Sequence, residues 1–298
     1  MTTPMAQGGS NVEYRCRMAG VSRAGYYRYL QDAAPLQEEM GVRDAMQRVA
    51  LAHRHYGYRR VTAQLRRDGM VVNHKRVLRL MRSDNLLCLP QRPFVPRTTQ
   101  SGHGWKIVPN LARGLIVTGT DQLWVADITY IHLREAFVYL AVVLDAFSRR
   151  VVGWALEAHL EASLAVAALR MALAARRPAP GTLIHHSDRG VQYACGEYRA
   201  ELATHDVQAS MSRVGNPYDN AKAESFMKTL KTEEVNGTAY RDIDHVRGST
   251  NEFIENVYNR DRLHSALNYL SPVEFEMKLS AAEAAVQPPP PQTMVTCP

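Results

Sequence analysis

Three acidic residues that lie far apart in the chain have the types and settings needed for metal-dependent chemistry on phosphodiesters. Asp127 lies within the apolar run Trp124–Ile131. Asp188 follows an apolar stretch that ends at His186, and 35 residues separate it from Glu224, which lies in a predicted helix. Carboxylate oxygens suit magnesium or manganese. A strand, a strand end and a helix can bring three such groups onto a pair of divalent ions, which drives in-line attack on a phosphodiester.

Each acid also has an ordinary structural explanation. Asp127 shares its strand face with apolar residues, where an ionised carboxylate is costly unless it is paired. A metal is one partner, and a neighbouring amide or arginine is the alternative. Asp188 begins a Ser-Asp-Arg-Gly sequence that is also typical of a simple turn. Asp145 is expected to order a turn, and at least one of His185 and His186 is expected to pack inward.

Glu224 has support from its own helix. On a helix of 3.6 residues per turn, Glu224, Lys228 and Lys231 fall within about 60° of one another. The apolar residues occupy a separate face: Ala223, Phe226, Met227 and Leu230. This pattern predicts a metal ligand followed by two phosphate contacts. The alternative is ordinary Glu–Lys pairing on a solvated face. Asp219 and Asn220 are expected to cap this helix.

The charge of the 298-residue chain is uneven. Residues 1–117 carry 19 Lys/Arg against 7 Asp/Glu, a net charge of +12. Residues 118–298 carry 17 against 22, a net charge of −5, and together these give the overall +7. The basic half is expected to attract nucleic acid through phosphate neutralisation, with a merely solvated basic surface as the alternative.

Several classes of protein are disfavoured. The longest wholly apolar run, Ala136–Leu144, has nine residues and is too short to span a bilayer. The start of the chain lacks the pattern of a signal peptide. Cys16, Cys88, Cys195 and Cys297 form no paired motif, which favours a reduced cytoplasmic setting and disfavours a zinc module.

The N-terminal part is predicted to be helical. Residues 1–34 read as a tail and a partial helix-turn-helix with a turn at Gly20 and a cap at Ser22. Residues 35–89 read as a helical DNA-binding domain, with helices at Gln37–His53, Tyr58–Asp68 and Asn73–Ser83. The last is predicted to be the recognition helix, capped by Asn73. Because few acids are present to pair the arginines, we expect DNA contacts from Arg59, Arg60, Lys75, Arg76 and Arg79. A small bundle with solvated arginines is the alternative.

The C-terminal part changes to an α/β pattern. Residues 90–117 have the composition of a basic Pro/Gly linker. Residues 118–278 predict a mixed sheet with helices on both faces. Its strands are expected at Gln122–His132, Phe137–Leu144, Val151–Ala155, Thr182–His186 and Val207–Ser210. Helices are expected at Ala162–Ala175, Tyr193–His205 and Val246–Arg260 and around Glu224. Residues 279–298 are expected to be a disordered Pro-rich tail.

These residues together resemble a known family, the second-reading-frame (OrfB) transposases of the IS-three group of bacterial insertion sequences. The resemblance spans residues 15–275 and rests on motifs in a fixed order. They are Gly20-Val-Ser-Arg-Ala-Gly-Tyr-Tyr27, His55-Tyr-Gly-Tyr-Arg-Arg60, Trp124-Val-Ala-Asp-Ile-Thr-Tyr-Ile131, Asp145-Ala-Phe-Ser-Arg149, His186-Ser-Asp-Arg-Gly-Val-Gln-Tyr193, Ser210-Met-Ser-Arg213, Asn220-Ala-Lys-Ala-Glu-Ser-Phe226 and Tyr258-Asn-Arg-Asp-Arg-Leu-His264.

The resemblance implies a DDE transposase with an RNase H-like core similar to that of retroviral integrases. It implies that Asp127, Asp188 and Glu224 are the catalytic acids and that Lys228 and Lys231 contact DNA. It further implies two magnesium or manganese ions, cleavage at the element's ends, and transfer of the freed 3′-hydroxyl to another phosphodiester. The implied partners are double-stranded end and target DNA, further copies of the chain and a first-frame (OrfA) product. The implied location is the bacterial cytoplasm, at the nucleoid.

Two other hypotheses compete with a transposase. One is a non-catalytic DNA-binding regulator or degenerate element remnant, in which the basic half binds DNA and the core is a scaffold. The other is an RNase H-like nuclease that cuts without joining. Metal-dependent strand transfer on end DNA separates the three, because a regulator performs neither step and a nuclease performs only the first.

Overall fold

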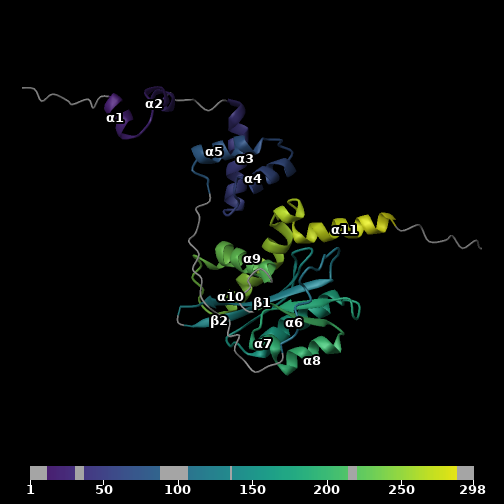
Figure 1. The fold of residues 1–298 in the computed structure, drawn as a ribbon. Coiled ribbons are helices and arrows are strands. Elements are labelled where there is room, and N and C mark those ends of the chain that lie inside the picture. The colour runs from purple at the N-terminus through teal and green to yellow at the C-terminus, as the bar shows by residue number, and fades with distance from the viewer. Residues whose placement is uncertain (1–11, 31–36, 88–106, 135, 214–219, 287–298) are drawn as a thin grey trace, which may run out of the picture. The chain divides into compact units, whose positions relative to one another are not determined.

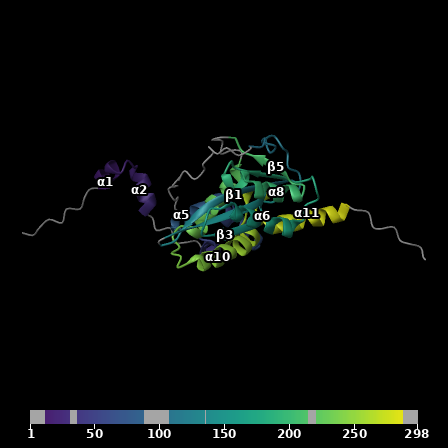
Figure 2. The same ribbon diagram turned by 90° about the horizontal axis from the view of Figure 1, so that it is seen from below.

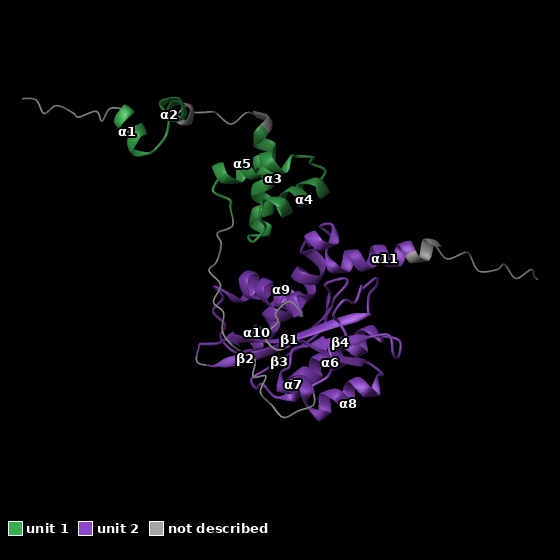
Figure 3. Ribbon diagram, viewed as in Figure 1, with its two compact units in different colours: residues 1–88 green, residues 89–298 purple. Residues whose placement is uncertain are grey.

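The chain forms two compact units, residues 1–88 and residues 89–298 (Figure 3). The structure is a computed structural model that describes residues 12–30, 37–87, 107–134, 136–213 and 220–286.

The described part of the first unit is helical. It contains α1 (Val12–Met18), α2 (Arg23–Leu30), α3 (Gln37–Ala52), α4 (Tyr58–Arg67) and α5 (His74–Ser83). Apolar side chains at helical spacing bury one face of α4 and one of α5, including Val61, Leu65, Val77 and Leu80. The three helices predicted between residues 37 and 83 are therefore confirmed to within a residue or two at each end.

Two predicted helix caps are present. The side-chain oxygen of Asn73 accepts a hydrogen bond from the backbone N–H of Lys75 at 2.9 Å. The hydroxyl of Ser22 accepts one from the backbone N–H of Gly25 at 3.0 Å. Each bond satisfies an N–H group that the first turn of a helix leaves without a partner, and so fixes where α5 and α2 begin.

The second unit is built on a five-stranded mixed sheet, as predicted. Its strands are β1 (Leu123–His132), β2 (Phe137–Asp145), β3 (Val151–Glu157), β4 (Ile184–Ser187) and β5 (Gln208–Met211). Their order across the sheet is β3-β2-β1-β4-β5. The first three strands form an antiparallel meander, while β4 pairs in parallel with β1 and β5 in parallel with β4.

Helices cover both faces of this sheet (Figures 1 and 2). On one face pack α6 (Ala162–Arg176), α7 (Val191–Ala194) and α8 (Gly196–Thr204). On the other pack α9 (Ala221–Leu230), α10 (Ile243–Glu252) and the π-helix η3 (Phe253–Asp261). Successive residues of β1 alternate between the two apolar cores, which is why the strand is apolar on both sides.

Two of the predicted helices are each divided into two helices in the structure. The single helix expected over Tyr193–His205 is two helices, because Cys195 between α7 and α8 has an extended backbone and its sulfur accepts the N–H of Tyr198. The helix expected over Val246–Arg260 is α10 followed by η3, with a short π-helix η2 (Lys231–Val235) also following α9.

The expected boundaries of the linker and the tail were also wrong in part. The end of the predicted linker joins the core: Val108 and Val117 pack on it, and the backbone N–H of Leu111 donates to the Ser210 hydroxyl at 2.8 Å. The last helix, α11 (Pro272–Val286), continues past residue 278 because its Ala-rich sequence favours helix. Residues 88–106 and 287–298 lie outside the described residues.

Candidate active site

Asp127 and Asp188 lie beside each other because of the parallel pairing of β1 with β4. That pairing matches Leu123 with Ile184 and Val125 with His186, an offset of 61 residues. Asp127 and Asp188 have the same offset, and neighbouring strands lie about 4.8 Å apart. Asp127 is half-buried on the strand face that looks toward α9, and Asp188 follows the last residue of β4.

Helix α9 brings Glu224 to this face. Its start is fixed to β1 by Asn220, whose side-chain amide donates to the carbonyl of Ala126 at 3.0 Å. Just beyond its end, the Lys231 ammonium lies 4.7 Å from the centre of the Tyr130 ring. The helix thus runs along the part of β1 that contains Asp127. Asn220 stands at the N-cap position, but its side chain makes this cross-link instead of the expected cap.

Asp188 and Glu224 both act electrostatically on Asp127. Burial, followed by the negative charge of Asp188, raises the pKa of Asp127 to about 7, and the charge of Glu224 acts in the same direction. A hydrogen bond from the backbone N–H of Ile128, at 2.9 Å, and the ammonium of Lys231 oppose the shift. Burial also raises the pKa of Glu224. Asp127 therefore senses the charges of the two other acids that the sequence analysis grouped with it.

The chemistry of the donors fits a divalent cation. All three groups are carboxylates, and a cation would offset both the burial and the repulsion that raise the pKa of Asp127. The arrangement is not a closed ligand cluster: in the described ranges, no three His, Cys, Asp or Glu side chains are placed to hold one metal ion. Glu224 is exposed, and its rotatable side chain can change direction without a shift of α9.

Tyr193 is a neighbour of the acids that sequence reasoning missed. Its side chain is buried on α7, and its hydroxyl has no hydrogen-bond partner within the described part of the chain. Burial raises its pKa well above the usual value, and the charges of Asp188 and Asp127 add to that effect. A buried donor without a partner beside two carboxylates fits a site that takes up a further polar ligand. Only the last position of the His186–Tyr193 motif pointed to it.

Other candidates have structural roles. Asp145 is fully buried, and its oxygens accept from the backbone N–H groups of Asp121, Phe147 and Ser148, so it orders the turn as predicted. His186 lies between the hydroxyls of Ser210 and Ser212, at 2.8 and 3.0 Å. Asp188 also accepts from the N–H of Gly190 at 2.9 Å, so the turn interpretation holds alongside the functional one.

The two predicted lysines after Glu224 differ in exposure. Lys228 is exposed in the last turn of α9, whereas Lys231 is half-buried against Tyr130. Burial lowers the pKa of Lys231, and the charge of Asp127 partly restores it. Lys231 therefore lies near enough to Asp127 for the two charges to interact.

The basic residues predicted in the first unit are less free than the sequence suggested. Glu39 of α3 pairs with Arg79 and lies 3.7 Å from Arg76, and it also approaches Arg43. Arg59 and Arg60 lie near the rings of Tyr58 and Tyr56, respectively. Lys75 and Arg79 line an open pocket along α5. The argument that few acids pair the arginines was therefore wrong for Arg76 and Arg79, because the pairing acid lies about 40 residues away.

Family comparisons define the class of this protein. The integrase core domain model matches residues 118–217, a second integrase core domain model matches residues 205–272, and an HTH-like domain model matches residues 37–94. An HTH-like domain followed by an integrase core, with one aspartate on a strand, a second just after the neighbouring strand and a glutamate on a helix, defines a DDE polynucleotidyl transferase.

Relatives define the family within that class. The chain is 37% identical over 274 residues to Transposase InsF for insertion sequence IS3A of Escherichia coli K12, covering 90% of this chain and 94% of that protein. It is 38% identical over 268 residues to the Insertion element IS600 uncharacterized 31 kDa protein of Shigella sonnei, covering 88% and 97%. The chain belongs to this family of insertion-sequence transposases.

Solved structures are more distant. The simian T-cell lymphotropic virus intasome in complex with PP2A regulatory subunit B56 gamma shares 16% identity at a TM-score of 0.45, over 85% of this chain and 80% of that one. The HTLV-2 integrase catalytic core domain in complex with magnesium shares 13% identity at a TM-score of 0.40, over 52% and 96%. As for membranes, the described residues contain no helix with the length and apolarity of a bilayer span.

Proposed function

We propose that this transposase cuts DNA at the ends of its insertion sequence and joins the freed 3′-hydroxyl to another phosphodiester, with Asp127, Asp188 and Glu224 as its catalytic acids. The observation that carries the proposal is the parallel pairing of β1 with β4, with α9 packed on the same sheet face as Asp127. The charges of Asp188 and Glu224, which act together with burial to raise the pKa of Asp127, support it. These are the three acids that the family resemblance implies, and they lie 61 and 36 residues apart in sequence.

The cofactor in this proposal is magnesium or manganese, with two ions per site. Bound ions would activate the attacking oxygen and stabilise the leaving oxygen, so no covalent enzyme intermediate is needed. Asp127, held by β1, and Asp188, at the end of β4, supply fixed carboxylates. Glu224 supplies a third from an exposed position on α9 and would turn toward Asp127 when the site is complete.

The remaining residues serve to hold DNA. Lys228 and Lys231 would contact phosphates beside the acids. In the first unit, Lys75, Arg76 and Arg79 on α5 and Arg59 and Arg60 on α4 would contact the element's ends. Arg76 and Arg79 would exchange Glu39 for phosphates. We further propose that the transposase assembles on DNA at the nucleoid, with further copies of the chain and with a first-frame (OrfA) product.

Glu224→Gln tests the assignment of chemistry. The substitution removes one charge and keeps the size of the side chain, so we expect strand transfer on end DNA with magnesium to fall on the order of a thousand-fold or more. Binding measured by gel shift should change little. The matched control is Glu197→Gln, at an exposed glutamate on α8 on the other sheet face.

The same assay separates the alternatives. A non-catalytic regulator would bind end DNA and neither cut nor join it, and a nuclease would cut without joining. Undiminished joining by Glu224→Gln would refute the role of Glu224.

A further inference from the structure

A pocket in the core unit has none of the three acids among its lining residues. It has a volume of about 300 Å³, and all of its lining residues belong to the part of the chain that the structure describes. Its walls come from residues 115–117, the β2–β3 turn, α9, the short helix η4 (Ser265–Leu267) and α11. Its apolar lining includes Val117, Phe147, Leu267 and Phe275.

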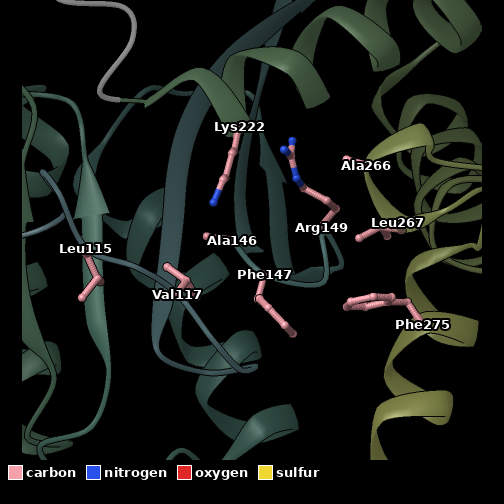
Figure 4. A pocket seen from close by; sticks show the side chains of 9 residues that line it. All are labelled: Leu115, Val117, Ala146, Phe147, Arg149, Lys222, Ala266, Leu267 and Phe275. Carbon is pink, nitrogen blue, oxygen red and sulfur yellow. The ribbon is translucent and has the colours of Figure 1, made fainter.

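Two cationic side chains are among the lining residues of this pocket. Figure 4 shows Lys222 reaching down from α9 and Arg149 extending from the β2–β3 turn toward the same helix. No acidic residue is among the lining residues. Asp145 lies near enough to act on Lys222, but its oxygens already accept from three backbone N–H groups and the Ser148 hydroxyl. Two like charges are thus held together without a carboxylate in the pocket wall.

The backbone conformation of Arg149 also supports a role for its side chain. Its φ is +63°, in the left-handed region that favours glycine or asparagine. Its N–H donates to the Asp145 carbonyl at 2.9 Å, which closes the turn. A glycine would satisfy this turn with less strain, so an arginine here is best explained by what its side chain does.

We propose that Lys222 and Arg149 bind a phosphate group of the DNA backbone in this pocket. The proposal rests on the proposed function and deepens it. Lys222 and Glu224 are two residues apart on α9, about 200° around the helix, so they face opposite sides of its first turns. A phosphate bound by Lys222 would therefore belong to DNA next to the segment that lies at the three acids. Such a contact would set the path of the strand past Glu224.

The test is a phosphate-neutralisation scan of end DNA, measured as binding without divalent cations so that chemistry does not contribute. Duplexes with a single neutral methylphosphonate at each successive position are titrated with wild type, Lys222→Gln and Arg149→Gln. We expect neutralisation of one particular phosphate to leave the binding affinity of each variant unchanged, and this phosphate should be the same for both variants. We also expect each to lower the slope of log K against log salt by about 0.9, the value for one phosphate contact.

Three further variants serve as controls. Arg149→Lys and Lys222→Arg keep the charge and should retain the wild-type slope and sensitivity map. Arg199→Gln removes a charge from α8 on the other sheet face and should leave the map unchanged.

The inference is overturned if the maps of Lys222→Gln and Arg149→Gln match wild type, or if the charge-retaining variants lose as much as the glutamine variants. A wild type that cuts and joins DNA while those maps match would leave the proposed function standing. A wild type that fails to bind end DNA would remove both.

Discussion

At the scale of single residues, burial decides what His185 does. Its side chain is buried and its Nε2 lies 2.9 Å from the Tyr198 hydroxyl. Burial, followed by the charge of His186, lowers the pKa of His185 to about 3. The unfolded chain, with a pKa of about 6.5, binds the proton more readily between pH 3 and 6.5. This histidine therefore contributes stability at neutral pH that is lost as the pH falls through that window.

A comparison of wild type with His185→Asn isolates this effect, because the other titrating groups cancel. Between pH 7 and pH 5, wild type should lose about 2 kcal/mol of unfolding free energy relative to the variant. Urea denaturation at the two pH values measures the difference. An identical pH dependence in the two proteins would show that His185 is not held neutral by burial.

Residue types and patterns predicted the three acids but not all of their surroundings. Asp127 stood out because a charge inside an apolar strand needs a partner. The Tyr193 hydroxyl, which has no partner among the residues that the structure describes, and the bond from Asn220 to the Ala126 carbonyl depend on how α7 and α9 pack. No local pattern contains this information. The same holds for Glu39, whose partners Arg76 and Arg79 come from another helix.

At the scale of elements, the close packing of α6 against β3 depends on Gly153. A Cβ added at Gly153 would stand 2.3 Å from the Ala168 carbonyl oxygen and 2.7 Å from the Ala172 nitrogen. Both are backbone atoms of α6, so the helix itself would have to move.

Gly153→Ala should therefore destabilise the core unit by at least about 3 kcal/mol, the upper part of the range for overpacking. Thermal unfolding measures this. Gly248→Ala in α10 is the control, since a Cβ there meets nothing within 4 Å and alanine is the better helix former. Equal stability of the two variants would contradict the close contact between α6 and β3.

The elements were largely predictable from periodicity. Each of the five strands was predicted at its place, because runs of apolar residues separated by turn signals are strong local patterns. The break between α7 and α8 was not, since it depends on one extended residue and a thiol cap.

At the scale of the whole molecule, the two units differ in net charge. Residues 1–88 carry 15 Lys/Arg against 7 Asp/Glu, whereas residues 89–298 carry 21 against 22. The first unit, with its HTH-like domain, is therefore expected to supply most of the attraction to DNA.

Deletion of residues 1–88 should lower the affinity for end DNA at least about ten-fold at physiological salt and flatten its salt dependence. Filter binding over a salt series measures both quantities. A truncated chain with unchanged affinity would place end recognition in the integrase core.

The central claim is that Asp127, Asp188 and Glu224 together bind divalent cations next to DNA. A manganese titration of the end-DNA complex, followed by electron paramagnetic resonance, tests it most directly. We predict two tightly bound ions in wild type, both absent in Asp127→Asn. Equal manganese binding by wild type and Asp127→Asn would contradict the account.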